Sequence, residues 1–327
     1  MNILLYGAGQ RLFYELANVD YYFQCMRQNS INIVGILDGN EEKVGKEIVL
    51  NKGKYIVHRK EEWNKYEFQY LVITSQKYYD EISMELIKSG VQKYKIISLQ
   101  HFLAPYNDQL FHTQLYQNKL GIEIGGPSEL FSNIYSVCKS CDGVNYSDRT
   151  VWWEGQDAYQ YNEKILGKVC ICDATDMSIV PDSNYDFLLS SNNLEHIANP
   201  IKALKEFQRV VKPGGYMLII VPNKKYTFDH NRTFTNFKHI LCDFESNVQE
   251  NDLTHLTEII EKHDYDMDRA CGGKENFIKR AEHNFTNRCL HHHVFGKECL
   301  KQMFDYIGVR VIESTEVGSN FIILGEK

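Results

Sequence analysis

The sequence has few features that would place the protein outside the ordinary globular class. Only 6 of its 327 residues are proline, and no stretch approaches the roughly 20 apolar residues of a membrane-spanning helix. The amino terminus has a short apolar run without a basic segment before it, so no signal peptide is expected. With 43% hydrophobic and 24% charged residues, the chain has the composition of a folded protein and the length of two domains.

Positive charge is also scarce. The formal net charge is -7 at pH 7, and no basic run offsets it, which argues against broad nucleic-acid binding. The nine cysteines are odd in number and scattered, and Cys138 and Cys141 form the one CxxC pair, with no second pair at zinc-finger spacing. We therefore expect a cytoplasmic protein with reduced thiols and without a nucleic-acid partner.

The amino-terminal region begins with the outline of a dinucleotide-binding fold. An apolar run at 2–6 leads into Gly7-Ala8-Gly9 and a helix, and a second strand at 31–37 ends in Asp38. This order of strand, GxG turn, helix, strand and acidic residue places a carboxylate where a ribose would bind. The third glycine of the usual motif is missing, because Leu12 stands at its position.

Strands and helices continue to alternate along this region. Apolar runs at 70–74 and 94–98 predict two more strands around a helix at 79–89, so we expect a small parallel sheet. The domain, over residues 1–105, resembles the Rossmann-like amino-terminal domain of some bacterial sugar-modifying enzymes. Nucleotide binding and a purely structural role in docking or dimerisation stand as equal alternatives. A polar segment at 106–118 is expected to be a linker.

The second region, from residue 119 onward, is organised around Glu123-Ile124-Gly125-Gly126. A buried strand ends in a carboxylate, two glycines allow a tight turn, and Pro127 suits the first turn of a helix. A strand, a glycine turn and a helix in this order form the place where α/β sheets hold nucleotide-like ligands. Two adjacent glycines after a strand are weak evidence alone, so the later elements decide their meaning.

Those later elements follow in a characteristic order. Apolar runs at 169–172 and 185–191 predict two strands, and Asn199-Pro200 then opens an amphipathic helix as its cap and first-turn proline. The motifs along this stretch are Asp173-Ala174, Tyr185-Asp186, Leu194-Glu195-His196 and Arg209-Val210-Val211-Lys212-Pro213-Gly214-Gly215. With these motifs, residues 119–327 resemble a class I S-adenosylmethionine-dependent methyltransferase with a type 11-like domain.

The resemblance implies an α/β fold, in which a Rossmann-like methyltransferase sheet ends in an antiparallel carboxy-terminal hairpin. It also implies S-adenosylmethionine as the cofactor. The residues it places around that cofactor are Glu123, Gly125, Gly126, Asp142, Asn145, Asp173, Ala174, Ser191 and Asn192. In that pattern Asp142, or failing that Asn145, would hold the ribose hydroxyls, and Asp173 would read the adenine amino group.

An insert at 223–295 is rich in His, Asp and Arg, and we expect it to select the acceptor. A neutral imidazole can take a proton from an acceptor hydroxyl, because its unperturbed pKa lies near working pH. The candidate bases, in order of preference, are His230, His255, and then His291 or His292. The candidate substrate contacts are Arg232 and Arg288, which would clamp a phosphate or carboxylate, and His293.

Each of these side chains also has a plain structural alternative, in ion pairs or packing within the insert. A divalent metal held by His and Asp is a less favoured alternative. Outside the triplet that begins at His291, no HxH, HxxxH or HExxH spacing supports it, so no metal ligand is assigned.

Together the patterns predict methyl transfer from S-adenosylmethionine to a hydroxyl of a polar small molecule. A sugar, a sugar nucleotide or a surface-glycan precursor is the favoured acceptor, by analogy with the two-domain architecture. Two other classes stay open: a nicotinamide-dependent sugar-nucleotide enzyme using Gly7-Ala8-Gly9 and Asp38, and a non-catalytic binding module. A homodimer is compatible with either domain.

Overall fold

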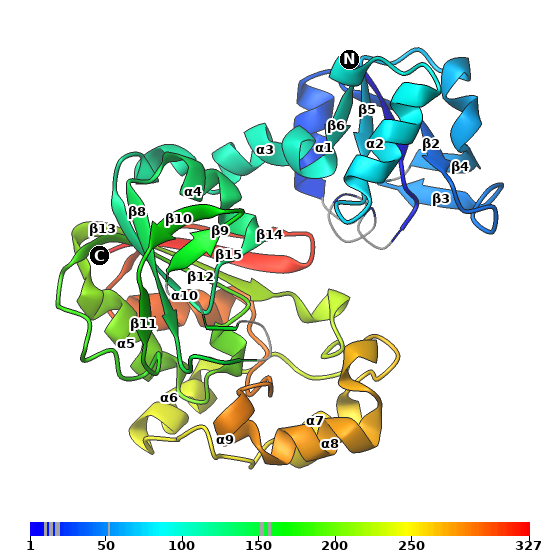
Figure 1. The fold of residues 1–327 in the computed structure, drawn as a ribbon. Helices are drawn as coiled ribbons and strands as arrows, with labels where there is room; N and C mark the ends of the chain where they lie inside the picture. The colour runs from blue at the N-terminus through cyan, green and yellow to red at the C-terminus, as the bar shows by residue number, and fades with distance from the viewer. Residues whose placement is uncertain (10–11, 13–15, 17–19, 52, 151–153, 156–157) are drawn as a thin grey trace. The chain divides into compact units, whose positions relative to one another are not determined.

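In the computed structural model the chain divides into two compact units, which we call the first unit (Met1–Leu110) and the second unit (Phe111–Lys327) (Figure 1). The residues that the structure describes are 1–9, 12, 16, 20–51, 53–150, 154–155 and 158–327. Within these ranges no helix is both long and apolar enough to cross a membrane.

The first unit is built on a six-stranded sheet in the order β3-β4-β2-β1-β5-β6. All neighbouring strands run parallel except β3, which is antiparallel to β4. The elements are β1 (Asn2–Tyr6), α1 (Asp20–Gln28), β2 (Asn32–Asp38), β3 (Glu47–Leu50), β4 (Gly53–Arg59), β5 (Tyr70–Ile73), α2 (Tyr79–Lys88), β6 (Ile96–Ser98) and α3 (Leu99–Leu110). The expected small α/β domain is confirmed, and β3 and β4 are additions to the predicted set.

The segment expected to be a polar linker is helical in its first part. Helix α3 extends to Leu110, and a single 3-10 turn at Thr113–Tyr116 follows it. The buried residues of α3 include Leu99, Phe102 and Leu103, which recur at the spacing of one helical face. The Gln and Asn residues that suggested a linker therefore lie among apolar positions that pack this helix.

The second unit contains a seven-stranded sheet in the order β11-β8-β7-β12-β13-β15-β14. The first five strands in this order, from β11 through β8, β7 and β12 to β13, are parallel, and β15 runs antiparallel to both β13 and β14. The strands are β7 (Leu120–Ile124), β8 (Ser140–Asn145), β11 (Val169–Ile171), β12 (Tyr185–Ser191), β13 (Val211–Pro222), β14 (Arg310–Val317) and β15 (Asn320–Glu326), with a separate hairpin of β9 (Tyr159–Tyr161) and β10 (Lys164–Gly167). The predicted Rossmann-like sheet with an antiparallel carboxy-terminal hairpin is confirmed.

Helix α5 (Pro200–Val210) shows why the sequence folds this way. The side chain of Asn199 accepts a hydrogen bond from the backbone N–H of Lys202, which caps the helix, and Pro200 occupies its first turn. Its buried face, which includes Phe207, packs in one cluster with residues of the sheet and of α10 (Lys297–Tyr306). Burying such an aromatic side chain contributes about 1.5–3 kcal/mol.

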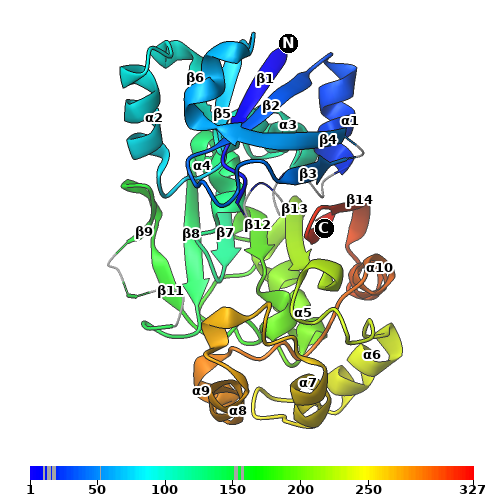
Figure 2. The same cartoon turned by 90° about the vertical axis from the view of Figure 1, so that its right-hand side faces the viewer.

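The insert lies at the carboxyl end of the parallel strands. Figure 2 shows its helices beyond the arrowheads of β7, β8 and β12. Two hydrogen bonds fix this position: the Tyr146 hydroxyl donates to the Thr286 carbonyl at 3.1 Å, and the His292 N–H donates to the Glu195 carbonyl at 2.9 Å. The helices of the insert are α6 (Phe237–Glu245), α7 (Leu256–Lys262), α8 (Lys274–Glu282) and α9 (Asn284–Asn287), whereas α4 (Ser132–Val137) connects β7 to β8.

Candidate active site

The turn after β7 requires glycine at both positions, for different reasons. Gly125 has a φ of +76°, and a Cβ there would lie 2.5 Å from the Nδ2 atom of Asn193. A Cβ on Gly126 would lie 2.2 Å from the Glu123 carboxylate and 2.2 Å from the Tyr159 hydroxyl. The turn is therefore packed from beneath by buried polar side chains and can present only backbone to a ligand.

Glu123 supports this turn from inside the fold. Its side chain is fully buried, and it accepts hydrogen bonds from the hydroxyls of Tyr135 at 2.5 Å and Tyr159 at 2.7 Å, and from the Ser128 N–H at 3.0 Å. Burial raises the pKa of Glu123 to about 7, although the three hydrogen bonds lower it. The carboxyl thus lies directly behind Gly126, where an ammonium group above the turn would favour its ionised form.

This raised pKa gives a testable pH dependence of stability. An acid whose pKa is higher in the folded state binds its proton more tightly there. The stability that the protonated Glu123 contributes to the folded state is therefore fully present below about pH 4.5 and is lost as the pH rises to about 7. A shift of this size corresponds to about 3 kcal/mol. Wild-type protein should lose about that much stability between pH 4.5 and 7.5 relative to Glu123→Gln. Urea unfolding of both proteins at the two pH values measures the difference, and parallel pH profiles would contradict it.

Three buried polar atoms next to the turn have no internal partner. They are the Nδ2 atom of Asn145, the Oγ atom of Ser191 and the Oδ1 atom of Asn193, none of which has a hydrogen-bond partner within the described ranges. Asn145 ends β8 and Ser191 ends β12, the two strands that flank β7. A buried polar group without a partner costs about 1–3 kcal/mol, so a ligand that bonded these atoms would recover that free energy. The residues therefore fit a polar cofactor lying across the strand ends.

Asp142 lies within β8 rather than at its end. Asp142 pairs with Ile122 in the sheet register, well before the carboxyl end of β8. Its carboxylate accepts hydrogen bonds from the Tyr185 hydroxyl at 2.7 Å and from the Lys168 N–H at 2.9 Å, which ties it to the first residue of β12. The strand runs on to Asn145 because Val144 and Asn145 still pair with β11. Asn145, the alternative, is thus the residue at the carboxyl end of the strand.

Asp173 and Arg288 form an ion pair with each other. The Asp173 carboxylate accepts hydrogen bonds from the N–H and the hydroxyl of Thr175, and it lies 3.0 Å from the Arg288 guanidinium. Burial acts to raise the pKa of Asp173, but the two hydrogen bonds and Arg288 outweigh it, so the pKa is lowered. Arg288 also lies 3.5 Å from Glu250, so its charge is balanced inside the fold rather than offered to a substrate. Ala174 packs against the main core beside them.

Titratable side chains converge just beyond β12. One ligand-type atom from each of Glu195, His196 and His291 lies within 4.8 Å of the others, and the rings of His196 and His291 have centroids 4.5 Å apart. Burial raises the pKa of Glu195 to about 7 and lowers that of His196 well below its ordinary value. Near pH 7 the His196 imidazole is therefore neutral and the Glu195 carboxyl is about half protonated, beside Asn193 and the glycine turn.

His291 is oriented by a buried carboxylate. Its Nδ1 atom lies 2.6 Å from the Asp229 carboxylate, and Asp229 also accepts a hydrogen bond from Arg232 at 2.9 Å. Burial alone lowers the pKa of His291, but Asp229 raises it by more, so it lies above its ordinary value. Burial likewise opposes the pKa shift of Asp229, which His291 and Arg232 lower to about 2. An imidazole held through Nδ1 leaves its Nε2 atom for proton transfer.

The other predicted residues of the insert lie in separate environments. His230 lies 2.9 Å from Asp264 and is partly exposed, and His292 lies 3.0 Å from the Asn284 amide. The Arg232 guanidinium donates to the carbonyls of His291 and His292, so this expected substrate clamp instead holds the backbone of the insert. Asn192 is exposed, whereas its neighbour Asn193 faces the turn.

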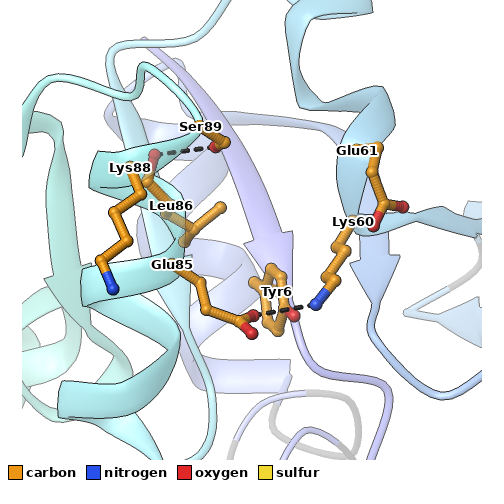
Figure 3. A pocket seen from close by; sticks show the side chains of 7 residues that line it. All are labelled: Tyr6, Lys60, Glu61, Glu85, Leu86, Lys88 and Ser89. Carbon is orange, nitrogen blue, oxygen red and sulfur yellow. Dashed lines mark hydrogen bonds and ion pairs between the residues drawn. The ribbon is translucent and has the colours of Figure 1, made fainter.

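In the first unit, Asp38, the carboxylate expected to bind a ribose, has partners within the protein. Asp38 accepts a hydrogen bond from the Ala8 N–H at 2.7 Å and lies 3.1 Å from the Lys43 ammonium. A cavity of about 340 Å³ lies nearby and is lined by Tyr6, Lys60, Glu61, Glu85, Leu86, Lys88 and Ser89. Figure 3 shows the Tyr6 ring between Glu85 and Lys60, which pair at 2.9 Å. Neither Asp38 nor the glycines line this cavity.

Comparison with known proteins assigns a family model to each region. Residues 120–219 match a model described as a methyltransferase domain, and residues 1–97 match one described as C2185-like, N-terminal. Over 59 residues the chain is 36% identical to the ubiquinone/menaquinone biosynthesis C-methyltransferase UbiE of Cupriavidus necator. That match covers 18% of this chain and 24% of the relative, so the chain spans about a quarter of the length of that relative.

Solved structures of methyltransferases are also similar, at low identity. A SAM-dependent methyltransferase from Aquifex aeolicus is 14% identical, with 74% of this chain and 97% of that chain covered and a TM-score of 0.39. The 1,6-didemethyltoxoflavin-N1-methyltransferase of Burkholderia thailandensis, with its substrate and S-adenosylhomocysteine bound, is 10% identical, with coverages of 77% and 89% and a TM-score of 0.41. The family match over 120–219 and the strand order of the second unit therefore support a SAM-dependent methyltransferase domain.

Proposed function

We propose that the second unit transfers a methyl group from S-adenosylmethionine to a hydroxyl of a polar small molecule. The observation that carries this proposal is the pairing of His291 with Asp229 next to Glu195, at the same strand end as the glycine turn. A base at that position can take the proton that a hydroxyl loses when it is methylated. An acceptor amine needs such a base less, because its proton is lost more readily.

The residues at the strand ends fit the cofactor, which supplies an electrophilic methyl group when it is bound. The backbone of Gly125 and Gly126 would face its methionine portion, with the Glu123 carboxyl behind the turn. Asn145 would hydrogen-bond the ribose. Asp173 and Ala174 would bind the adenine, and Ser191 and Asn193 would line the floor between them, where their partnerless atoms lie.

The chain's own residues then perform three tasks in the reaction. Asp229 holds the imidazole of His291 in one orientation, and Arg232 holds Asp229 in place through the hydrogen bond at 2.9 Å. The Nε2 atom of His291 would accept the proton of the acceptor hydroxyl as its oxygen attacks the methyl carbon. Alignment of the two reactants would supply much of the remaining acceleration, because methyl transfer needs a near-linear approach.

A polar acceptor is favoured by the lining of the insert. A cavity of about 160 Å³ there is bordered by Arg232, Thr233, Phe234, Thr235, Asn236, His239, His255, Glu258 and His292. All but one of these side chains are polar, which suits a hydroxyl-rich acceptor better than a quinone or a lipid. We therefore propose a sugar, a sugar nucleotide or a glycan precursor as the acceptor class.

Calorimetry with S-adenosylhomocysteine tests the first part of this function. We expect one site per chain, and an absence of binding would contradict the methyltransferase assignment. Incubation with S-adenosylmethionine and a panel of sugars, sugar nucleotides, amines and phenols tests the second part, with mass spectrometry detecting products one methyl group heavier. Product from amines alone would contradict hydroxyl transfer while leaving the cofactor assignment intact.

A further inference from the structure

A second cluster of imidazole and carboxylate side chains forms inside the insert, apart from His291. His239 and Asp243 project from the same face of α6, one turn apart. His255 stands immediately before α7, and His293 belongs to the extended segment before α10. Three stretches that are distant in the sequence therefore meet at one point, which we call the His3Asp cluster.

The polar atoms of this cluster approach one another closely. The Nε2 atom of His239 lies 3.0 Å from the Nε2 atom of His255 and 3.2 Å from the Oδ2 atom of Asp243. The Nε2 atom of His293 lies 3.8 Å from the same Asp243 oxygen. In a tetrahedral zinc site with bonds of about 2.1 Å, ligand atoms lie about 3.4 Å apart. The separations among His239, Asp243 and His293, whose ligand atoms all lie within 4.8 Å of one another, bracket this distance, and His255 joins the group through its contact with His239.

Hydrogen bonding alone does not account for so many groups at one point. A single proton on His239 can serve either His255 or Asp243, but not both. The Oδ2 atom of Asp243 and the Nδ1 atom of His293 are buried and lack a hydrogen-bond partner among the residues with described positions. The Nε2 atom of His293 that lies near Asp243 also lies 3.2 Å from the Ala198 carbonyl, a contact that holds the ring in place and whose proton a metal would replace.

The charges around the cluster leave its carboxylate available to a cation. Among the described residues, the ion-pair partners of Asp243 are the imidazoles of His239 and His293. The guanidinium of Arg232, which lines the adjacent cavity, is paired with Asp229. By contrast, Arg280 lies 3.7 Å from Asp268 in the group formed by His263, Asp268 and Cys271, where a cation would be repelled.

We propose that His239, Asp243, His255 and His293 bind a divalent transition metal, which their ligand chemistry identifies as zinc. Imidazole nitrogens favour zinc over magnesium or calcium, and four protein ligands form a closed site of structural type. Because its ligands come from α6, the start of α7 and the segment before α10, the metal would hold the insert together beside the polar cavity. The site would exist whether or not the second unit transfers methyl groups.

Metal analysis of the full chain tests this proposal directly. Protein purified without chelator should contain about one zinc per chain by inductively coupled plasma mass spectrometry. Removal of the metal should lower the melting temperature, and Zn²⁺ but not Mg²⁺ should restore it. The cobalt-substituted protein should show the visible absorption of a four-coordinate site. Loss of even an outer partner of a metal ligand costs about 10–100-fold in affinity, so Asp243→Asn should weaken zinc binding by at least about 100-fold.

Two further variants keep the test decisive. His239→Gln combined with His255→Gln should abolish zinc binding, whereas His283→Gln, at an exposed position of the same insert, should bind zinc like the wild type. Circular dichroism and binding of S-adenosylhomocysteine show whether each variant is folded. The proposal would be overturned if the wild type bound zinc no more tightly than the double variant. Zinc binding without S-adenosylhomocysteine binding would instead contradict the proposed function alone.

Discussion

Replacing His291 with glutamine should lower kcat by about 10²–10⁴-fold, the range expected for loss of a general base. The substitution keeps a side chain of similar length but removes the proton-accepting nitrogen. Affinity for S-adenosylhomocysteine should stay within a few-fold of the wild-type value, because His291 lies beside Asp229 and Glu195 rather than under the glycine turn. Single-turnover kinetics at saturating cofactor would measure the effect, and calorimetry would verify cofactor binding.

Two companion variants identify the base. His283→Gln, in the same insert, should leave turnover unchanged. A large loss of turnover in His230→Gln, with His291→Gln active, would contradict the assignment and return the role to the histidine paired with Asp264.

The pH profile separates catalysis from structural damage. A base must be neutral to act, so wild-type activity should fall as the pH drops through the pKa of His291, which Asp229 raises. In Asp229→Asn that carboxylate is lost, so the acid limb should move to lower pH. A variant damaged only in its structure would lose activity at every pH without moving the limb.

Replacing Gly126 with alanine should have the second large effect, on cofactor binding. The new Cβ would lie 2.2 Å from both the Glu123 carboxylate and the Tyr159 hydroxyl, and neither group can move outward because both are buried. Overpacking of this kind costs about 1–3 kcal/mol. Because the strain falls on the turn itself, affinity for S-adenosylhomocysteine should drop by more than about tenfold. Calorimetry and urea unfolding measure the two effects.

Gly214 offers a matched control. Its φ is +73°, so alanine there carries backbone strain, but its Cβ would meet nothing within 4 Å. Gly214→Ala should therefore lower stability modestly and leave cofactor affinity unchanged. If it weakened S-adenosylhomocysteine binding as much as Gly126→Ala, the collision with Glu123 would not be the cause.

Local sequence patterns were sufficient for the strands of the large sheet in the second unit, though not for the β9–β10 hairpin or for helices α6 and α8. The apolar run before Gly125, the cap and proline at Asn199-Pro200, and the strands of the terminal hairpin each depend on neighbours within a few residues. Such patterns determine where a strand or helix forms and which motif follows it. They also predicted the glycine turn, because a turn between a strand and a helix is itself a local feature.

Residue-level assignments within those elements were less secure. Asp142 was expected at the end of β8 because it has the right chemistry, but the strand continues to Asn145, where pairing with β11 ends. Asn192 is exposed and Asn193 lies against Gly125, and the sequence does not show which of two adjacent amides faces that turn. Element ends and side-chain directions depend on the neighbouring strands, and a single sequence does not contain that information.

What the sequence determined by itself is the order of strands, glycine turn and helices around Glu123-Ile124-Gly125-Gly126, because each is set by short-range periodicity and turn chemistry. Only the tertiary structure decided which histidine meets which carboxylate. Asp229 and His291 are 62 positions apart, and the His3Asp cluster joins three segments across the insert. Contacts at such separations arise from packing of the whole unit. The histidine-rich composition therefore indicated a polar site but did not show which side chain pairs with each histidine.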